Sequence, residues 1–459
     1  MKSLLLALAI MARYASCVLA ADATPKGDLP ARVDAIAAEA LDSGIVGLSV
    51  AVISKGQPVV VKGYGFANLE HKVLATADTV YHICSVTKNF TAGAILKLIE
   101  QGKLELDTDI TSVIPQFASD GRKITVRQLL NHTSGIRSYT ELGPIFDSKE
   151  KLDLSHDEVL ALIQGAPPDF APGTHWHYSN SGFFLLGLII EAASGQAYSD
   201  FLQQQIVEPL KLDHTCLCDN EPIIPSRSQS YLIARGKPRN ADYISWRPVF
   251  SAGAICSTVM DLARWQQALD AGQVVKPELL ALMREPTNIP GAPPLDYALG
   301  TRLGSLEGHR CAGHTGSGAG FNALLQRFPD DDLTIVVLTN TEGARIGASS
   351  IAAKIARAAL GLPAVPLTSR PVPSADQAAV AGEYPSENGV ITLAANGDVM
   401  VAKPRGASGP GLALTYLGDR TFAAGAPDHR IKFFVQPDGS VWAIETSAGL
   451  FVSASKRIP

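Results

Sequence analysis

Residues 85–101 read SVTKNFTAGAILKLIEQ and join a Ser-x-x-Lys tetrad to the start of an apolar helix. Apolar side chains recur at helical spacing, at Phe90, Ala94, Ile95, Leu98 and Ile99, and Gly102 follows as a stop signal. Positions i and i+3 lie on one face of a helix, so we expect the Ser85 hydroxyl and the Lys88 amine within hydrogen-bond reach. The tetrad therefore predicts a serine nucleophile with a lysine proton acceptor.

The tetrad alone is a weak signal, because Ser148–Lys151 and Ser453–Lys456 have the same spacing. The first of these lies in a charged loop and the second lies near the chain end. Only Ser85 opens a long apolar helix, whose N-terminal N–H groups would favour a developing oxyanion. The neighbouring thiol of Cys84 is expected to pack as an apolar side chain and not to act as a catalyst.

The segments around this helix predict strands from both ends of a long region. The runs 46–53 and 58–64 flank turn residues 54–57 and indicate a hairpin, and 321–328 and 333–340 (LTIVVLTN) read as later strands. Helices are expected at 32–41, 183–193 and 348–360. The pattern predicts an α/β (α+β) fold in which one antiparallel sheet is flanked by helices and a helical subdomain is inserted into it.

Composition divides the chain into four segments. Residues 1–20 read as a signal peptide, with Lys2 before an apolar stretch and small residues at its end. Residues 21–360 form the predicted main domain, and the proline-rich residues 361–374 form a linker. Residues 375–459 carry short alternating runs separated by Asn-Gly and Asp-Gly turns, which indicates a small antiparallel β-barrel.

Two further motifs carry chemistry. Tyr178-Ser179-Asn180 precedes the helix at 183–193, and a phenol and an amide suit proton transfer and the binding of a carbonyl. The alternative is that Ser179 or Asn180 caps that helix. His314-Thr315-Gly316-Ser317 leads through glycines into a strand, where an exposed N–H could complete an oxyanion hole. The alternative there is a turn with an incidental histidine.

The three motifs together resemble the serine β-lactamase and penicillin-binding-protein superfamily, in its class C-like, esterase and D-stereospecific peptidase branch. Residues 129–135 (LLNHTSG), Pro172-Gly173 before Trp176, and Ser257-Thr258 before Asp261-Leu262 add to the resemblance, which covers about residues 31–360. The resemblance implies the β-lactamase/transpeptidase-like fold for this region. Small barrels accompany the hydrolase domain in some members of the family.

The resemblance also assigns roles. Ser85 is the implied nucleophile, Lys88 and Tyr178 are the implied proton-transfer pair, and Asn180 positions the substrate. His314, Thr315, Gly316 and Ser317 form the implied substrate-binding strand, with an oxyanion hole between the N–H groups of Ser85 and Ser317.

The sequence departs from β-lactamases at His314, where those enzymes have lysine. A lysine is a permanent cation suited to a carboxylate, whereas histidine is largely neutral at pH 7. This favours the esterase-like or D-amino-acid peptidase relatives. Arg345 is a candidate replacement cation, although a solvated loop arginine is the alternative. His132 is interpreted as structural, and His175 and His177 have no metal-binding spacing.

Composition excludes several classes of protein. A formal charge of −5 argues against nucleic-acid binding, and no segment has the length of a transmembrane helix. The motifs H-E-x-x-H, G-x-S-x-G and the Walker loop are absent, so we expect no metal and no cofactor. The signal peptide predicts a secreted or periplasmic protein. Outside that signal the cysteines are odd in number, so at least one stays unpaired in the monomer.

The sequence therefore predicts a serine hydrolase that cleaves an amide or ester through a Ser85 acyl-enzyme. D-amino-acid or cell-wall-type peptides are the expected substrates, and no feature specifies an oligomeric state. A carboxylesterase or weak β-lactamase is one alternative. A penicillin-binding-like recognition protein with little turnover is another.

Overall fold

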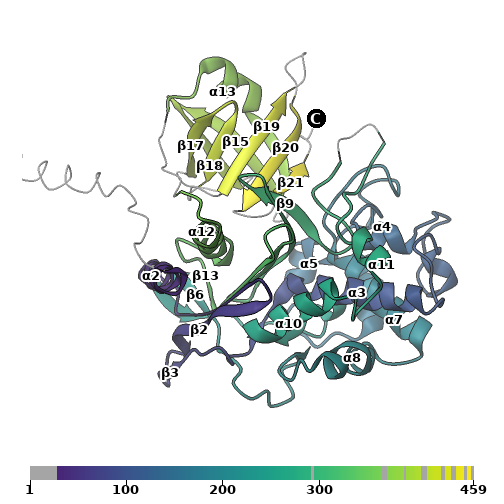
Figure 1. The fold of residues 1–459 in the computed structure, drawn as a ribbon. Coiled ribbons are helices and arrows are strands. Elements are labelled where there is room, and N and C mark those ends of the chain that lie inside the picture. Colours follow the sequence, from purple (N-terminus) through teal and green to yellow (C-terminus); the bar gives the residue numbers. More distant parts are fainter. Residues whose placement is uncertain are drawn as a thin grey trace, which may run out of the picture.

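The computed structural model describes residues 28–290, 294–363, 370–386, 389–404, 411–424, 429–435, 441–448 and 452–455. The predicted signal peptide at 1–20 lies outside these residues, as does much of the predicted linker at 361–374. Figure 1 shows a large α/β unit with a smaller sheet beside it, formed by the C-terminal part of the chain. Among the described residues no helix is long and apolar enough to cross a membrane.

The large unit is built on a 7-stranded sheet in the order β3-β2-β1-β12-β11-β10-β9. Its strands are β1 Gly47–Ser54, β2 Gln57–Asn68, β3 Val73–Leu74, β9 Arg302–Leu306, β10 His309–Gly318, β11 Phe321–Phe328 and β12 Leu333–Thr339. Every neighbouring pair is antiparallel. The first hairpin joins the last strand of the sheet through the register Val50↔Val337. The prediction of one antiparallel sheet assembled from distant segments is confirmed.

Both faces of this sheet are covered, which explains why β12 is buried along its whole length. Successive side chains of a strand point to opposite faces. Ile335 and Val337 pack in the layer formed with helices α2 (Leu29–Asp42) and α12 (Ala348–Leu360). Val336 and Leu338 face the larger core that contains the remaining helices. Helices therefore cover both faces of the sheet, as the sequence predicts (Figure 1).

Three helices of the larger core position the residues of the candidate active site: α3 Thr87–Glu100, α7 Asn180–Ser194 and α10 Val259–Asp270. The other helices of this region are shorter: α4 Val126–Leu130, α5 Pro144–Asp147, α6 His156–Gln164, α8 Tyr198–Leu202, α9 Glu208–Leu210 and α11 Pro277–Leu282. Helix α7 is apolar on nearly all sides because it lies inside this layer. It ends at Gly195, which adopts the left-handed conformation that glycine tolerates best.

Two small sheets complete the large unit. One has the order β4-β8-β5 (Tyr81–His82, Ile255–Ser257, Cys216–Leu217), and the other has the order β13-β6-β7 (Thr341–Glu342, Tyr231–Ala234, Lys237–Asn240). A disulfide between Cys218 and Cys256 ties the first of them together. Cys84, Cys216 and Cys311 remain as thiols among the described residues, which agrees with the odd count in the sequence.

The C-terminal unit is a curled antiparallel sheet of eight strands in sequence order, preceded by α13 Ser374–Val380. The strands are β14 Gly382–Ser386, β15 Gly389–Asn396, β16 Val399–Pro404, β17 Leu412–Gly418, β18 Thr421–Ala424, β19 His429–Val435, β20 Val441–Ala448 and β21 Val452–Ser455. It has a core of its own around Met400, Phe422 and Phe433. The expected small antiparallel barrel is thus present as an open, curled sheet (Figure 1).

Candidate active site

The hydroxyl of Ser85 lies at the point where strand β4 turns into helix α3. A 3₁₀ turn, η2 (Cys84–Val86), makes this connection, and Cys84 has a φ of 48°. A left-handed residue other than glycine is uncommon, and it sharpens the turn so that Ser85 is only half-buried between buried neighbours. The thiol of Cys84 points into the core, where burial raises its pKa far above the ordinary value.

The side chain of Lys88 is fully buried one turn further on and has three oxygen neighbours. Its Nζ lies 3.2 Å from Ser85 Oγ, 2.8 Å from Asn180 Oδ1 and 2.7 Å from the carbonyl oxygen of Ala252. An ammonium ion donates one hydrogen to each oxygen, but burial disfavours this charged form. The neutral amine keeps two hydrogens for Asn180 and Ala252, whose oxygens can only accept. Its lone pair then faces Ser85 Oγ and can take up the hydroxyl proton.

The Tyr178-Ser179-Asn180 motif reaches Lys88 from the start of helix α7. The Ser179 hydroxyl accepts a hydrogen bond from Gly182 N at 3.3 Å and so caps the helix, as the alternative interpretation of the motif proposed. The cap places Asn180 at the first helical position, within reach of the amine. The Tyr178 ring is buried, and its centroid lies 4.7 Å from Lys88 Nζ. The motif therefore both caps helix α7 and brings side chains to Lys88.

Strand β10 passes directly beside the amide of Ser85. A Cβ atom added to Gly316 would lie 2.2 Å from the carbonyl oxygen of Ile83 and 3.0 Å from Ser85 N, so only glycine fits. Ser317 is exposed on the same strand. Thr315 is half-buried one residue before the glycine. The backbone around Gly316 and Ser317 thus lies where a second oxyanion donor would be needed.

Replacing Gly316 by alanine is expected to push β10 away from Ser85, because the new Cβ would meet backbone atoms that cannot rotate away. The expected loss in kcat is about 10²–10³-fold, the effect of losing one oxyanion donor. Gly318→Ala is the matched control on the same strand, because its Cβ would meet only Cys84 Sγ at 3.9 Å. Steady-state kinetics of both variants would test this, and equal activities would exclude the proposed role of the strand.

The His314 side chain is buried and makes its hydrogen bonds within the protein. Its side chain is 0% exposed. Nε2 lies 3.0 Å from the Tyr297 hydroxyl and Nδ1 lies 2.6 Å from the carbonyl oxygen of Thr315. Burial, followed by the nearby cations Arg302 and Lys88, holds the pKa of His314 well below its usual value. Both ring nitrogens are therefore engaged within the protein, and the assignment of His314 to the substrate-binding strand stays a prediction.

The candidate replacement cation, Arg345, lies in a loop on the surface. It is exposed, and its guanidinium donates to the carbonyl oxygen of Asp42 at 2.9 Å, as the alternative of a loop arginine suggested. A different arginine, Arg302, is buried in strand β9 with its guanidinium carbon 5.5 Å from the Tyr178 ring centroid. Sequence reasoning missed it because no motif contains it. Its place near the site depends on tertiary structure, because β9 pairs with β10 through Arg302↔Gly313.

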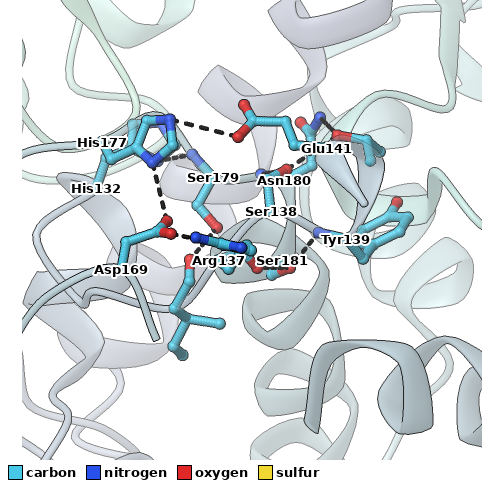
Figure 2. A network of polar contacts seen from close by, with 12 residues as sticks. His132, Arg137, Ser138, Tyr139, Glu141, Asp169, His177, Ser179, Asn180 and Ser181 are labelled. Carbon is cyan, nitrogen blue, oxygen red and sulfur yellow. Dashed lines mark hydrogen bonds and ion pairs between the residues drawn. The ribbon is translucent and has the colours of Figure 1, made fainter. Parts of the chain in front are cut away.

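An acidic network borders the site on the side of Asn180 (Figure 2). Asn180 Nδ2 donates to Thr140 Oγ1 at 2.9 Å, and Glu141 follows in the same 3₁₀ turn, η4 (Tyr139–Glu141). The Glu141 carboxylate lies 3.4 Å from His177 Nε2, and His177 Nδ1 lies 2.9 Å from Asp169. The hydrogen bond that His177 donates to Asp169 raises the pKa of His177 in spite of burial, with help from the charge of Glu141. The network thus places the Glu141 carboxylate near Asn180, paired with His177, while Asp169 pairs with both His177 and Arg137.

One cluster of potential metal ligands occurs among the described residues. His82, Cys218 and Cys256 are buried together. The disulfide occupies both sulfur atoms, and burial lowers the pKa of His82 to about 3. Because a metal prefers thiolates to a disulfide, this cluster does not fit a metal in its oxidised form.

Comparisons with known proteins agree with this geometry. A family model described as Beta-lactamase matches residues 33–359. A D-aminopeptidase of Brucella canis is 29% identical over 320 residues, which make up 69% of this chain and 60% of the relative. The chain therefore spans 60% of the length of that curated relative.

Solved structures extend the comparison. A D-stereospecific amidohydrolase from Streptomyces sp. superposes with a TM-score of 0.62 at 28% identity, covering 71% of this chain and 97% of that chain. An octameric penicillin-binding protein homologue from Pyrococcus abyssi superposes with a TM-score of 0.66 at 23% identity, covering 93% of this chain and 99% of that chain. The second match shows the fold alone. The chain belongs to the β-lactamase family.

Proposed function

We propose that the protein is a D-stereospecific peptidase or amidase that removes a D-amino acid from an amide through an acyl-enzyme on Ser85. The observation that carries the proposal is the position of the buried Lys88 amine, whose Nζ lies 3.2 Å from Ser85 Oγ. The D-aminopeptidase and D-stereospecific amidohydrolase among the similar proteins support the choice of substrate.

The proposed reaction has two halves. Lys88 takes the proton of Ser85 as Oγ attacks the substrate carbonyl, and the N–H groups of Ser85 and Ser317 stabilise the oxyanion. The C–N bond then breaks, and the proton passes by way of Tyr178 to the leaving amine. Water attacks the acyl-enzyme in the second half and gives its proton back through the same groups, so that Ser85 is regenerated. Neither half calls for a metal or a cofactor.

The charges around the site favour a substrate with a free α-ammonium group. His314 is neutral and buried, so it offers no cation to a substrate carboxylate. Glu141 supplies a carboxylate one residue after Thr140, which is bonded to Asn180. An α-ammonium held near Glu141 would place the scissile carbonyl between Asn180 and Ser85. A carboxylate at this position suits an amino-acid amide.

A second candidate function rests on Arg302. Its buried guanidinium near Tyr178 would suit a substrate with a free carboxylate, such as a β-lactam or a cell-wall peptide end. A panel of substrates separates the candidates: D- and L-phenylalanine amides, a chromogenic cephalosporin and a short nitrophenyl ester. We expect the D-amide to exceed the L-amide in kcat/KM by at least about 10²-fold, because a chiral pocket misplaces the wrong enantiomer. Faster cleavage of the cephalosporin or the L-amide would contradict the proposal.

Glu141→Gln is expected to raise KM for a D-amino-acid amide by about 10-fold, equivalent to about 1.4 kcal/mol, with little change in kcat. The reason is that glutamine keeps the size of the side chain but removes its charge. An N-acetylated D-amide is the matched control substrate, because it lacks the ammonium group and should not distinguish the two enzymes. Equal KM values for the free amide in both enzymes would show that Glu141 does not hold the amine.

The predicted location remains part of the proposal. Residues 1–20 carry the pattern of a cleaved signal, and a substrate derived from cell-wall peptides would be met outside the cytoplasm. N-terminal sequencing of protein recovered from culture medium or periplasm tests this. A mature chain that still begins at Met1 would contradict it.

A further inference from the structure

Three buried rings form a continuous hydrogen-bonded chain next to the site. His132, Tyr297 and His314 are 1%, 2% and 0% exposed. The Tyr297 hydroxyl lies 3.0 Å from Nε2 of His132 and 3.0 Å from Nε2 of His314. At the ends, the backbone nitrogen of Ser179 lies 3.1 Å from His132 Nδ1, and His314 Nδ1 lies 2.6 Å from the carbonyl oxygen of Thr315.

The two ends determine the direction of every bond in the chain. A backbone N–H can only donate, so Nδ1 of His132 accepts and its Nε2 carries the proton. A carbonyl oxygen can only accept, so Nδ1 of His314 carries the proton and its Nε2 accepts. Tyr297 must then accept from His132 and donate to His314. Both histidines are neutral in this arrangement, and each has a single tautomer.

The charges around the two rings support the same state. Lys88 and Arg302 lie near both rings, and His177 lies near His132. Burial first, and these cationic groups second, hold the pKa of both histidines well below the usual value. A proton on either ring would also break the chain, because each ring needs one accepting nitrogen. We therefore expect neither ring to titrate in the pH range in which the enzyme works.

The chain ends in the two segments that flank the nucleophile. Ser179 directly follows Tyr178, and the His132 ring packs against the Tyr178 ring at a centroid distance of 4.4 Å. Thr315 directly precedes Gly316, the residue whose backbone touches Ser85. The chain therefore spans from the loop of the proposed proton-transfer tyrosine to the strand of the proposed oxyanion hole.

Tyr297 is held at the middle of this span by helix α3. The turn after it closes through Ala298 N and Thr301 O at 2.8 Å, and Gly300 N donates to Leu130 O at 3.0 Å. A Cβ at Gly300 would lie 2.6 Å from Ala92 Cβ, which shows how closely the turn packs on the helix. The helix that begins beside the nucleophile thus also fixes the centre of the chain.

We propose that Tyr297 is a positioning residue, whose hydroxyl holds the Tyr178 loop and strand β10 at the separation that acylation of Ser85 requires. The inference rests on the proposed function, because it takes Ser85 as the nucleophile and the flanking segments as its partners. Tyr297 acts through His132 and His314.

The test compares Tyr297→Phe with Tyr198→Phe. Tyr198 is a matched control: it is also fully buried and also donates or accepts one side-chain hydrogen bond, to Thr91 Oγ1 at 2.7 Å, outside the chain. The activity readout is the second-order rate at which a fluorophosphonate labels Ser85, which does not depend on the identity of the natural substrate. The structural readout is ¹⁵N NMR of histidine-labelled protein.

We expect Tyr297→Phe to label about 10–100-fold more slowly, the scale of a misplacement of about 1 Å, and Tyr198→Phe to stay within about 2-fold. In the unmodified enzyme, NMR should show His132 protonated at Nε2 and His314 at Nδ1, and the His132 Nε2–H signal should shift only in Tyr297→Phe. Three results would overturn the inference: labelling of Tyr297→Phe within about 2-fold of the unmodified enzyme, an equal loss in the control, or the opposite tautomers. Absence of Ser85 labelling in the unmodified enzyme would instead remove the proposed nucleophile, and with it the reaction that Tyr297 serves.

Discussion

Ser85→Ala is expected to lower kcat by at least about 10⁴-fold, because no other group can form the acyl-enzyme. The fold should persist, since the Ser85 hydroxyl has one described hydrogen bond, to Lys88 Nζ at 3.2 Å, and is only half-buried. Turnover of a D-amino-acid amide and the thermal unfolding midpoint are the two measurements. Activity should vanish while the midpoint moves by no more than a few degrees, the scale of about 1 kcal/mol.

Ser148→Ala is the matched control for this variant, because Ser148 opens the Ser148–Lys151 tetrad of the same spacing. Its hydroxyl donates to the carbonyl oxygen of Ile145 at 3.1 Å, and it lies on the surface. The control should keep full activity. Retention of activity in Ser85→Ala, or its loss in Ser148→Ala, would place the nucleophile elsewhere.

Lys88→Met is the second change with a large expected effect. Methionine has a similar length but no lone pair of comparable basicity, so Ser85 loses its proton acceptor and kcat should fall by at least about 10³-fold. The change also leaves Asn180 Oδ1 and the Ala252 carbonyl without a donor, at a cost of about 1–3 kcal/mol for each buried group. Removal of a buried amine offsets part of this cost. A folded, inactive protein is therefore expected.

Lys97→Met provides the comparison on the same helix. Lys97 is partly buried and donates to the carbonyl oxygen of Val274 at 3.2 Å, so it has a similar local role without a serine neighbour. Rates over a range of pH should show normal activity for this control. If Lys88→Met kept more than about a tenth of the activity, another base would be taking the proton from Ser85.

The parts of the fold that a local sequence pattern indicates were predictable. The apolar run of β12 and the small-residue helix α12 both follow from periodicity within a dozen residues, and helix α12 has the predicted bounds Ala348–Leu360. The sequence predicted one sheet assembled from distant segments, but the pairing of β1 with β12 within it came only from the structure. The Cys218–Cys256 disulfide was not predictable, because spacing does not determine connectivity.

The site was predictable only where linear motifs mark it. Ser85 and Lys88 share a tetrad, and Asn180 belongs to a recognisable triplet. The Ala252 carbonyl carries no side-chain signal, since any residue would supply it. Glu141 and Tyr297 are single residues far from every motif, and they meet the site only through tertiary packing.

The two histidines show that burial, more than residue type, determines the charge and the contacts of a side chain. His132 was interpreted as structural and His314 as substrate-binding, yet they lie at the two sides of one tyrosine. The reference pKa of histidine suggested a largely neutral ring at position 314. The structure gives a stronger reason, because that ring is fully buried among cationic groups and has both nitrogens occupied.

The most direct measurement is the identification of the covalent intermediate. The enzyme would be mixed with an excess of a D-amino-acid ester, quenched with acid within milliseconds to seconds, and digested for peptide mass mapping. The account predicts that the mass of one acyl group appears on the peptide that contains Ser85 and disappears as product forms. An acyl group on a different residue, or turnover with no acylated peptide at any time, would contradict it.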